Sequence, residues 1–443
     1  MVHVRSWFGA AALLLTSGVF TAAQGTAHAA PSTDLTAAVT RKLLDRSAAD
    51  RPATRVTVTR HAGQEWASGT AVVVAPHQDE AYPKGWVFVA HAQPAGDWQV
   101  AFDGEAGFAD LAGAAPAAVV SGREKQVFST PSAPEGRTST ARYARTSTAQ
   151  HAGTSTARYV IAPAVQDAGT PKAQYTGQDY RTGMRLPYGL GQAWQLRGGP
   201  HGWNGDDEPW SSIDLAGGDQ RVLAARGGTA YTMCKGWIRI IHDRGYATDY
   251  YHLWNSIDVD GAHVDEGAYL GDTGTDVTCG GVAHGRHVHF ALRQNDAYVP
   301  IEGHNLGTWV IMNGDGIYRG YALHGSTRVN AVVPPDVLPG TNGGAPLATD
   351  ATLYNYGALA LNQGVIDTNG AGPVQKRSGP GTTYPVAGSA ADGTTVTISC
   401  SATGTSTTGR WGTNSLWNRL SDGTWVPDAF TWTGIDEPVA GAC

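Results

Sequence analysis

A threefold repeat in the middle of the chain limits what the chain can fold into more than any other feature. Residues 137–160 read RTSTARYA, RTSTAQHA and GTSTARYV, an eight-residue period without large apolar positions. Such a repeat cannot build a core, and its Ser, Thr and Ala content is typical of a linker that is flexible or glycosylated. The 443 residues therefore predict separate compact units rather than one continuous core.

A Pro- and Gly-rich stretch at 331–349 predicts a second linker. We therefore expect an N-terminal unit at 30–128, a Ser/Thr/Ala/Arg-rich linker at 129–182, a central unit at 183–330 and a C-terminal unit at 350–443. The arginines of the repeat would suit proteolytic cleavage. The N-terminal unit is then either a pro-region, as in a zymogen, or a permanent accessory domain on a tether.

The first 29 residues have the features of an export signal. His3 and Arg5 precede an apolar run, and residues 27–29 (AHA) have the small-residue form of a signal-peptidase site. The run is too short and too broken by polar residues to remain as a membrane anchor. We predict a signal peptide at 1–29 and a secreted protein, extracellular or associated with a cell wall.

The composition favours a mainly β fold, because 58 glycines and 14 tryptophans suit turn-rich sheets better than helices. In the N-terminal unit, helical spacing of Leu35, Val39 and Leu43 predicts one helix, while alternation at Val56 and Val58 predicts strands. We expect a small α+β N-terminal unit, an antiparallel β-sheet in the central unit and a small C-terminal β-barrel. The formal net charge of -7 argues against nucleic acid as the main partner.

Four cysteines are present, and none forms a C-x-x-C pair, so a cysteine-ligated zinc site is not expected. Export makes disulfides possible, and the sequence alone allows three pairings. If each unit folds separately, the natural choice is one bridge per unit, Cys234–Cys279 and Cys400–Cys443.

The central unit carries a set of potential metal ligands. The run HVHFAL reads as a strand, and alternation places His287 and His289 on the same face. Asp214 lies between two large apolar residues in a strand-like run, where a carboxylate is costly unless it is paired or ligated. His201 lies in a Gly- and Pro-rich loop, and His252 ends the second arm of a predicted hairpin.

Each of these residues alone is more often structural than functional. Two histidines and one aspartate, however, supply three protein ligands and leave a fourth tetrahedral position open, which is the layout of catalytic zinc. Zinc also suits mixed nitrogen and oxygen ligands and needs no redox control outside the cell. We therefore expect one Zn²⁺ in the central unit.

The order of these pieces resembles the lysostaphin and staphylolysin family of zinc endopeptidases, also called LytM-type. His201 and Asp214 have twelve residues between them, and YHL at 251–253, the glycine-rich EGAYLGDTGTDVTCGG and HVHFAL follow in the family's order. Many members carry HLHF where this chain has HVHF, and valine suits a strand equally well. The resemblance covers residues 183–330, about a third of the chain.

This resemblance implies that His201, Asp214 and His289 bind zinc and that His287 and His252 are catalytic histidines that do not bind it. His287 is then the general base and His252 faces the oxyanion, although the sequence leaves the reverse assignment open. The other histidines of the central unit are expected mainly to be structural: His242, His263, His284 and His304.

In the C-terminal unit, RSGPG at 377–381, Tyr384 and DGTWV at 422–426 resemble bacterial SH3-like domains. The two resemblances together imply that the substrate and partner is bacterial cell-wall peptidoglycan, which the enzyme would cut in its glycine-containing cross-bridges. In the C-terminal unit, Tyr384 and Trp425 are then either exposed aromatics that bind the wall or residues of the core. We expect a monomer without a membrane anchor. A secreted protease of glycine-rich proteins such as elastin, or a non-catalytic wall-binding protein, stays open.

Overall fold

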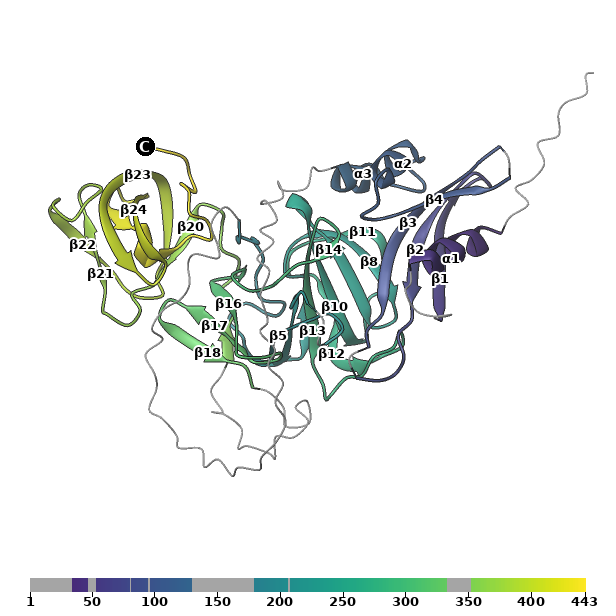
Figure 1. The fold of residues 1–443 in the computed structure, drawn as a ribbon, viewed down its shortest axis with the longest axis horizontal. Helices are drawn as coiled ribbons and strands as arrows, with labels where there is room; N and C mark the ends of the chain where they lie inside the picture. Colours follow the sequence, from purple (N-terminus) through teal and green to yellow (C-terminus); the bar gives the residue numbers. More distant parts are fainter. Residues whose placement is uncertain are drawn as a thin grey trace, which may run out of the picture.

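The structure, a computed structural model, describes residues 34–46, 53–79, 81–94, 96–129, 179–205, 208–332 and 352–443. The predicted signal peptide and most of both predicted linkers lie outside these residues. Figure 1 shows three β-rich parts in chain order, from the N-terminal unit at the right to the C-terminal unit at the left. The mainly β fold is therefore confirmed. Within the part of the chain that is described, no helix has both the length and the apolar character to cross a membrane.

The N-terminal unit is the predicted small α+β unit. Its helices are α1 (Leu35–Arg46), α2 (Phe108–Ala114) and α3 (Gly122–Ser129). Its antiparallel sheet runs in chain order through β1 (Thr54–Ala62), β2 (Trp66–Val73), β3 (Lys84–Ala92) and β4 (Trp98–Phe102). On one face of this sheet, Val39 and Leu43 of α1 pack against Phe88 and Phe102. The predicted helical spacing is therefore that of a core-facing helix.

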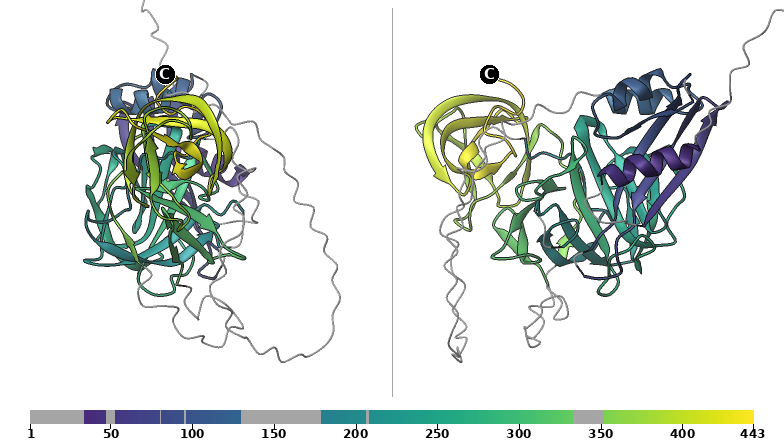
Figure 2. Two further views of the ribbon diagram at one scale, coloured as in Figure 1. Left: turned by 90° about the vertical axis from the view of Figure 1, so that its left-hand side faces the viewer. Right: turned by 45° about the vertical axis from the view of Figure 1, so that its right-hand side comes forward.

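The other face of the same sheet packs against the central unit. Val72 and Val87 lie in one buried cluster with Trp203, Tyr231 and Trp237 of the central unit. Figure 1 and the right-hand view of Figure 2 show the N-terminal sheet lying against the central sheet. The two units thus share a hydrophobic core, although the linker between them is long.

The central unit is built on an eleven-stranded sheet. Its main path is β11-β8-β9-β10-β13-β6-β5-β19, with β12 paired to β10 and β7, and β14 paired to β13. The strands are β5 (Ala193–His201), β6 (Ser212–Gly217), β7 (Arg221–Leu223), β8 (Gly228–Cys234), β9 (Trp237–Ile241), β10 (Tyr246–Trp254), β11 (Asp260–Val264), β12 (Tyr269–Asp276), β13 (Val288–Gln294), β14 (Ala297–Tyr298) and β19 (Thr352–Tyr354). The predicted hairpin is β9 and β10, joined through the short 3-10 turn η2 (Asp243–Gly245).

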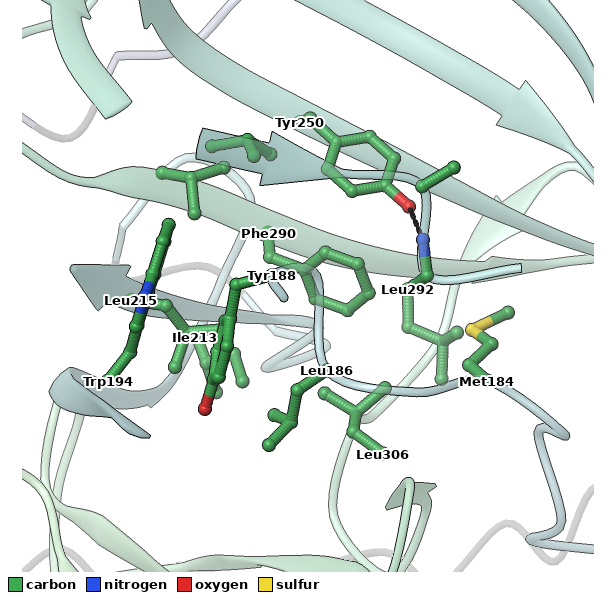
Figure 3. Close-up of a cluster of buried hydrophobic side chains, with 14 of the residues drawn as sticks. Met184, Leu186, Tyr188, Trp194, Ile213, Leu215, Tyr250, Phe290, Leu292 and Leu306 are labelled. Atoms are coloured by element: carbon green, nitrogen blue, oxygen red, sulfur yellow. Dashed lines mark hydrogen bonds between the residues drawn. The ribbon is translucent and has the colours of Figure 1, made fainter. Parts of the chain in front are cut away.

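A second, four-stranded sheet covers part of the central unit. It consists of β15 (Asn305–Leu306), β16 (Trp309–Asn313), β17 (Gly320–His324) and β18 (Thr327–Asn330). Leu306 from this sheet lies in the same buried cluster as Ile213 and Phe290 of the large sheet (Figure 3). In the same cluster, the backbone N–H of Ala225 donates to the hydroxyl of Tyr250 over 2.9 Å. This core fixes β6 and β13, two of the three strands that carry metal-ligand candidates.

The C-terminal unit is a seven-stranded sheet in the order β22-β21-β25-β24-β23-β20-β26. Its elements are β20 (Gln363–Ile366), β21 (Val374–Arg377), β22 (Val386–Ala390), β23 (Thr395–Gly409), β24 (Gly412–Leu420), β25 (Trp425–Pro427), η3 (Asp428–Phe430) and β26 (Thr431–Trp432). Trp425 is 9% exposed and therefore belongs to the interior, whereas Tyr384 is 44% exposed. Of the two aromatics considered for wall binding, only Tyr384 presents a large surface to a ligand.

Both predicted disulfides are present. Cys234, at the end of β8, is bonded to Cys279, which lies in the glycine-rich stretch after β12. Cys400 of β23 is bonded to Cys443 at the end of the chain. The first bridge ties one wall of the cleft described below to the central sheet.

Candidate metal centre and active site

Four neighbouring strands bring the predicted site residues together. In the order β10-β13-β6-β5, β10 carries His252, β13 carries His289, β6 carries Asp214, and β5 ends at His201. His289 and Asp214 are direct cross-strand partners, and Tyr251 faces His289 from the other side. Because opposed residues on one sheet face lie close together, the register places the side chains of His289 and Asp214 side by side.

His201 does not lie in a loop, as its Gly- and Pro-rich surroundings predict, but ends strand β5. The glycines before it are needed for close approach rather than for a turn. A Cβ on Gly198 would lie 2.5 Å from Oδ2 of Asp214, and a Cβ on Gly199 would lie 2.6 Å from the backbone N of Gly320. Glycine therefore lets β5 pass close to the Asp214 carboxylate, which places His201 beside it.

Three ligand atoms of the His201, Asp214 and His289 set converge on one point. Nε2 of His201 lies 3.2 Å from Nδ1 of His289, which lies 3.1 Å from Oδ1 of Asp214, and the third separation is 3.6 Å. In a tetrahedral zinc site, bonds of about 2.0–2.1 Å place ligand atoms about 3.3 Å apart. Each of these three atoms can offer a lone pair to a cation placed between them. The three side chains fit a zinc ion in their donor set and spacing.

Hydrogen bonds on the outer side orient these ligands. Nδ1 of His201 donates to the backbone oxygen of Gly199 over 2.7 Å, which leaves the Nε2 lone pair free. Burial lowers the pKa of His201 to about 4, so the imidazole is neutral and able to bind a metal. For Asp214, burial acts to raise the pKa, but the adjacent histidines outweigh it and hold the carboxyl pKa well below its usual range. The centre thus offers the neutral imidazole of His201 and the carboxylate of Asp214, with the ring of His289 as the third ligand candidate.

Two further histidines border this centre with a common orientation. Nδ1 of His287 donates to the backbone oxygen of Gly285 over 2.9 Å, and Nδ1 of His252 donates to that of Asp276 over 3.0 Å. Each ring therefore presents an unprotonated Nε2. That of His287 lies 3.6 Å from Oδ1 of Asp214, and the two rings are 4.9 Å apart. Burial lowers the pKa of both, which keeps them available as proton acceptors.

The backbone of His252 is in an uncommon conformation. Its φ is +68°, in the left-handed region, and the pairing of β10 with β12 shifts register between His252 and Trp254. A non-glycine residue held there costs about 1–3 kcal/mol, and such strain gathers at functional positions. The bulge turns the His252 ring toward His287.

Two tyrosines that sequence reasoning missed complete the cleft. The ring of Tyr318 stacks on His201 with centroids 4.0 Å apart, and Tyr82 stacks on His289 at 4.8 Å. Both line one pocket with Asp214 and His287, together with Arg197, Val282 and His284. Neither tyrosine lies in a motif. Tyr82 belongs to the N-terminal unit, so no signal within the central unit could reveal it.

The other histidines have different roles. His242 is buried, with its ring nitrogens hydrogen-bonded to the Gly227 carbonyl and the Thr248 hydroxyl, so it is structural, as predicted. His304 is buried as well, and His263 lies beside Asp265 at the surface. His284 differs from the expectation of a purely structural role, because it lines the cleft and lies 2.6 Å from Oδ1 of Asp79.

A buried ion pair supports the same strands behind the site. Arg239 of β9 and Asp249 of β10 form two contacts of 2.8 and 2.9 Å, and both side chains are fully buried. Trp237 and Tyr298 each donate to the same carboxylate over 2.9 Å. Burying a pair of charges is tolerable when all their hydrogen-bonding atoms are engaged, as they are for this carboxylate.

Comparison with known proteins identifies relatives of the central unit. Residues 208–301 match the sequence profile of peptidase family M23. Protease LasA of Pseudomonas aeruginosa is 32% identical over 146 residues, which are 30% of this chain and 35% of LasA. The beta-lytic metalloendopeptidase of Lysobacter enzymogenes is 27% identical over 139 residues, which are 29% of this chain and 78% of that protein.

One solved structure, the M23 metalloprotease pseudoalterin from the deep sea, shares 30% sequence identity. The match covers 33% of this chain and 94% of pseudoalterin, with a TM-score of 0.32. The chain thus spans 35% of the length of LasA but nearly all of pseudoalterin. On the match to the family profile, the central unit carries a domain of peptidase family M23.

Proposed function

We propose that this chain is a zinc metalloendopeptidase. The observation that supports this most strongly is the convergence of His201, Asp214 and His289 on one point, with His287 and His252 presenting unprotonated nitrogens beside it. Three ligands leave a coordination position open, which a structural zinc site would not. The family assignment and the names of its metalloendopeptidase relatives agree with this chemistry.

In this proposal, the protein residues divide the proton chemistry between them. Zinc at the three-ligand site would supply Lewis-acid activation of a water molecule and of the peptide carbonyl. His287, whose Nε2 lies nearest the ligand set, accepts the proton of the attacking water. His287 then passes that proton to the leaving amine. His252 lies beside His287, and its Nε2, after taking up a proton from solvent, would donate to the oxyanion.

The proposed substrate is a glycine-containing peptide, with the cross-bridges of bacterial peptidoglycan as the leading case. The walls that the central unit itself supplies support this choice, because Tyr318 and Val282 line the cleft. Gly280 and Gly281 form one wall, and a side chain at either position would collide with a backbone placed against it. Bonds flanked by glycine present the least side-chain bulk to such a cleft.

The remaining parts of the proposal concern the whole chain. A signal peptide at 1–29 and two disulfides support secretion. We propose that residues 30–128 are a pro-region and that the C-terminal unit, through the exposed Tyr384, binds cell wall. The working form is proposed to be a monomer.

The direct test compares purified cell walls that contain glycine cross-bridges with elastin as substrates. The protein is assayed as the full chain and after limited proteolysis, with and without a zinc chelator, and new amino termini are counted. We expect chelator-sensitive release from cell walls, lost in the His289→Ala variant. Preference for elastin would favour a protease of glycine-rich proteins. Binding to cell walls without any release in either form would leave a non-catalytic wall-binding protein.

A further inference from the structure

A segment of the N-terminal unit lies inside the proposed active-site cleft. It connects β2 to β3, and we call its described residues, 74–79 and 81–85, the cleft segment. Two backbone hydrogen bonds join it to the glycine-rich wall of the cleft. The N–H of Ala75 donates to the oxygen of Cys279, and the N–H of Gly281 donates to that of Pro76, both over 3.0 Å. This pattern is that of an extended peptide added to an exposed edge.

The glycines of the wall permit this approach. A Cβ on Gly280 would collide with the carbonyl of Ala75, and a Cβ on Gly281 would lie 2.6 Å from the oxygen of Ala81. Both glycines also have positive φ, at +99° and +76°. The wall is therefore shaped to receive a peptide backbone, and the cleft segment is the backbone that occupies it.

Tyr82 reaches the catalytic side of the cleft. Its hydroxyl lies 3.2 Å from Nε2 of His252 and 3.3 Å from the backbone oxygen of Val282. Because Nδ1 of His252 already donates to a carbonyl, its Nε2 accepts, and the phenol is the donor. The Tyr82 ring meanwhile covers one face of His289, a candidate metal ligand. One side chain thus engages a proposed catalytic histidine and shields a ligand of the metal site.

Contacts on both sides of Tyr82 hold the segment in place. The indole N–H of Trp203 donates to the Pro83 oxygen over 2.7 Å, and Arg239 donates to the Gly85 oxygen over 2.8 Å. His284 lies 2.6 Å from the carboxylate of Asp79 at the outer edge. The pocket lined by Asp214, His287 and Tyr318 includes Tyr82 as a further wall. A substrate peptide therefore cannot use this cleft while the segment remains.

We propose that the cleft segment is a built-in inhibitor that occupies the position of the substrate peptide, with the hydroxyl of Tyr82 engaging Nε2 of His252, the atom that faces the substrate in the proposed mechanism. This inference rests on the proposed peptidase function. The residues of the cleft segment block the site. Once the segment has left, the backbone of a substrate follows the same wall, from Cys279 to Val282. Held within the same folded chain, the segment competes at a high effective concentration.

The interface between the units adds a consequence for activation. Glu124 of α3 accepts from Tyr231 over 2.6 Å and pairs with Arg60 at 2.7 Å, and Arg60 also pairs with Asp260 of the central unit at 2.7 Å. These contacts and the shared core do not depend on the linker. A cut in the linker alone therefore leaves the cleft segment seated, and activation requires displacement or degradation of the N-terminal unit.

The experiment uses the full chain loaded with zinc, in three variants. Tyr82→Ala removes the blocking ring, Tyr82→Phe removes only the hydroxyl, and Tyr356→Ala changes an exposed tyrosine far along the chain as a matched control. Two rates are measured for each, the withdrawal of zinc by a coloured chelator and the hydrolysis of a glycine-rich peptide. Thermal unfolding verifies that each variant is folded.

We expect Tyr82→Phe to raise both rates by roughly two- to tenfold, the equilibrium factor for one net hydrogen bond, and Tyr82→Ala to raise them further. Tyr356→Ala should match the unchanged chain. A synthetic peptide with the sequence of residues 74–84 should inhibit the Tyr82→Ala chain more strongly than the same peptide with alanine for tyrosine.

The outcomes separate the two proposals. If the chain binds zinc and hydrolyses peptide at the same rate whether or not Tyr82 is present, and zinc withdrawal is equally unchanged, the inhibitor proposal is wrong and the peptidase proposal stands. If neither the full chain nor any variant binds zinc, the proposed function fails, and the inhibitor proposal fails with it.

Discussion

His289 and Asp214 face each other across neighbouring strands, and their ligand atoms lie 3.1 Å apart. The relationship is set by strand register rather than by loop geometry. Phe290 and Ile213, the next residues along β13 and β6, point to the opposite face and lie in the main core. The same alternation that buries these apolar residues therefore holds the two ligand candidates together, so the site is organised before any metal binds.

Asp214→Asn should greatly weaken zinc binding while leaving the fold intact. The amide keeps the size of the carboxylate but loses its negative charge, which no other residue of the ligand set supplies. Loss of an outer partner of a ligand already costs about 10–100-fold in affinity, and loss of a ligand should cost more. Zinc content per chain, measured by elemental analysis after dialysis against a weak chelator, should fall close to zero.

Asp219→Asn provides the control for that measurement. Asp219 accepts from the backbone N–H of Arg221 in the turn after β6, outside the ligand set. Its variant should retain the zinc content of the unchanged chain. Equal zinc content in the Asp214 and Asp219 variants would contradict the ligand assignment.

His287→Ala should separate catalysis from metal binding. His287 lies beside the ligand set but contributes none of its three converging atoms. We expect kcat/KM to fall by about 10²–10⁴-fold, the usual contribution of a general base, with zinc content unchanged. The measurement is made in the Tyr82→Ala background, so that the blocking ring is absent from both chains. Loss of zinc from the variant would show that His287 is a ligand rather than a base.

The five candidate site residues that the structure brings together could be singled out from the sequence because their signals are local. His287 and His289 sit in a short apolar strand, Asp214 lies between two core residues, and the order of the pieces resembles a known family. His201 was harder to place in a secondary structure. Glycine and proline normally indicate a loop, but here the glycines serve the close packing of β5 against Asp214 and Gly320.

Tyr82 and Tyr318 could not be predicted, because their positions depend on tertiary docking. Tyr82 is 170 residues before His252 in the chain and reaches it only when two separately organised units pack together. Tyr318 lies between β16 and β17, outside the large sheet, and meets His201 only when the small sheet covers β5. Neither tyrosine lies in a periodic pattern or a motif that would indicate such a contact.

His242 should make the stability of the chain depend on pH. Burial lowers its pKa to about 4, below the value of about 6.5 expected for an unfolded chain. The unfolded state therefore binds the proton more readily. The stabilisation is complete above pH 6.5 and is lost as the pH falls toward 4, by about 3 kcal/mol in total. Urea unfolding from pH 8 to pH 4.5 should show the decline.

The His242→Gln variant isolates this contribution. Glutamine can still bond to the Gly227 carbonyl or the Thr248 hydroxyl, but it has no charge to gain. The difference in unfolding free energy between the two chains should therefore shrink as the pH falls below 6.5, whatever its value at pH 8. A constant difference across this range would show that His242 binds its proton equally well in both states.

Asp249→Asn should destabilise the central unit strongly. The Asp249 carboxylate is fully buried and accepts from Arg239, Trp237 and Tyr298, so the substitution leaves the Arg239 charge buried without its main counterion. Breaking one partner of a buried pair costs about 3–5 kcal/mol.

The Asp243→Asn variant is the matched control, because the Arg226–Asp243 pair has similar geometry but lies at the surface. This variant should lose less than about 1 kcal/mol of unfolding free energy. Because Arg239 also donates to Gly85, the Asp249 variant should in addition release zinc to a chelator faster than the Asp243 variant, as the cleft segment loosens. Similar losses in the two variants would mean that the buried pair contributes no more than a surface one.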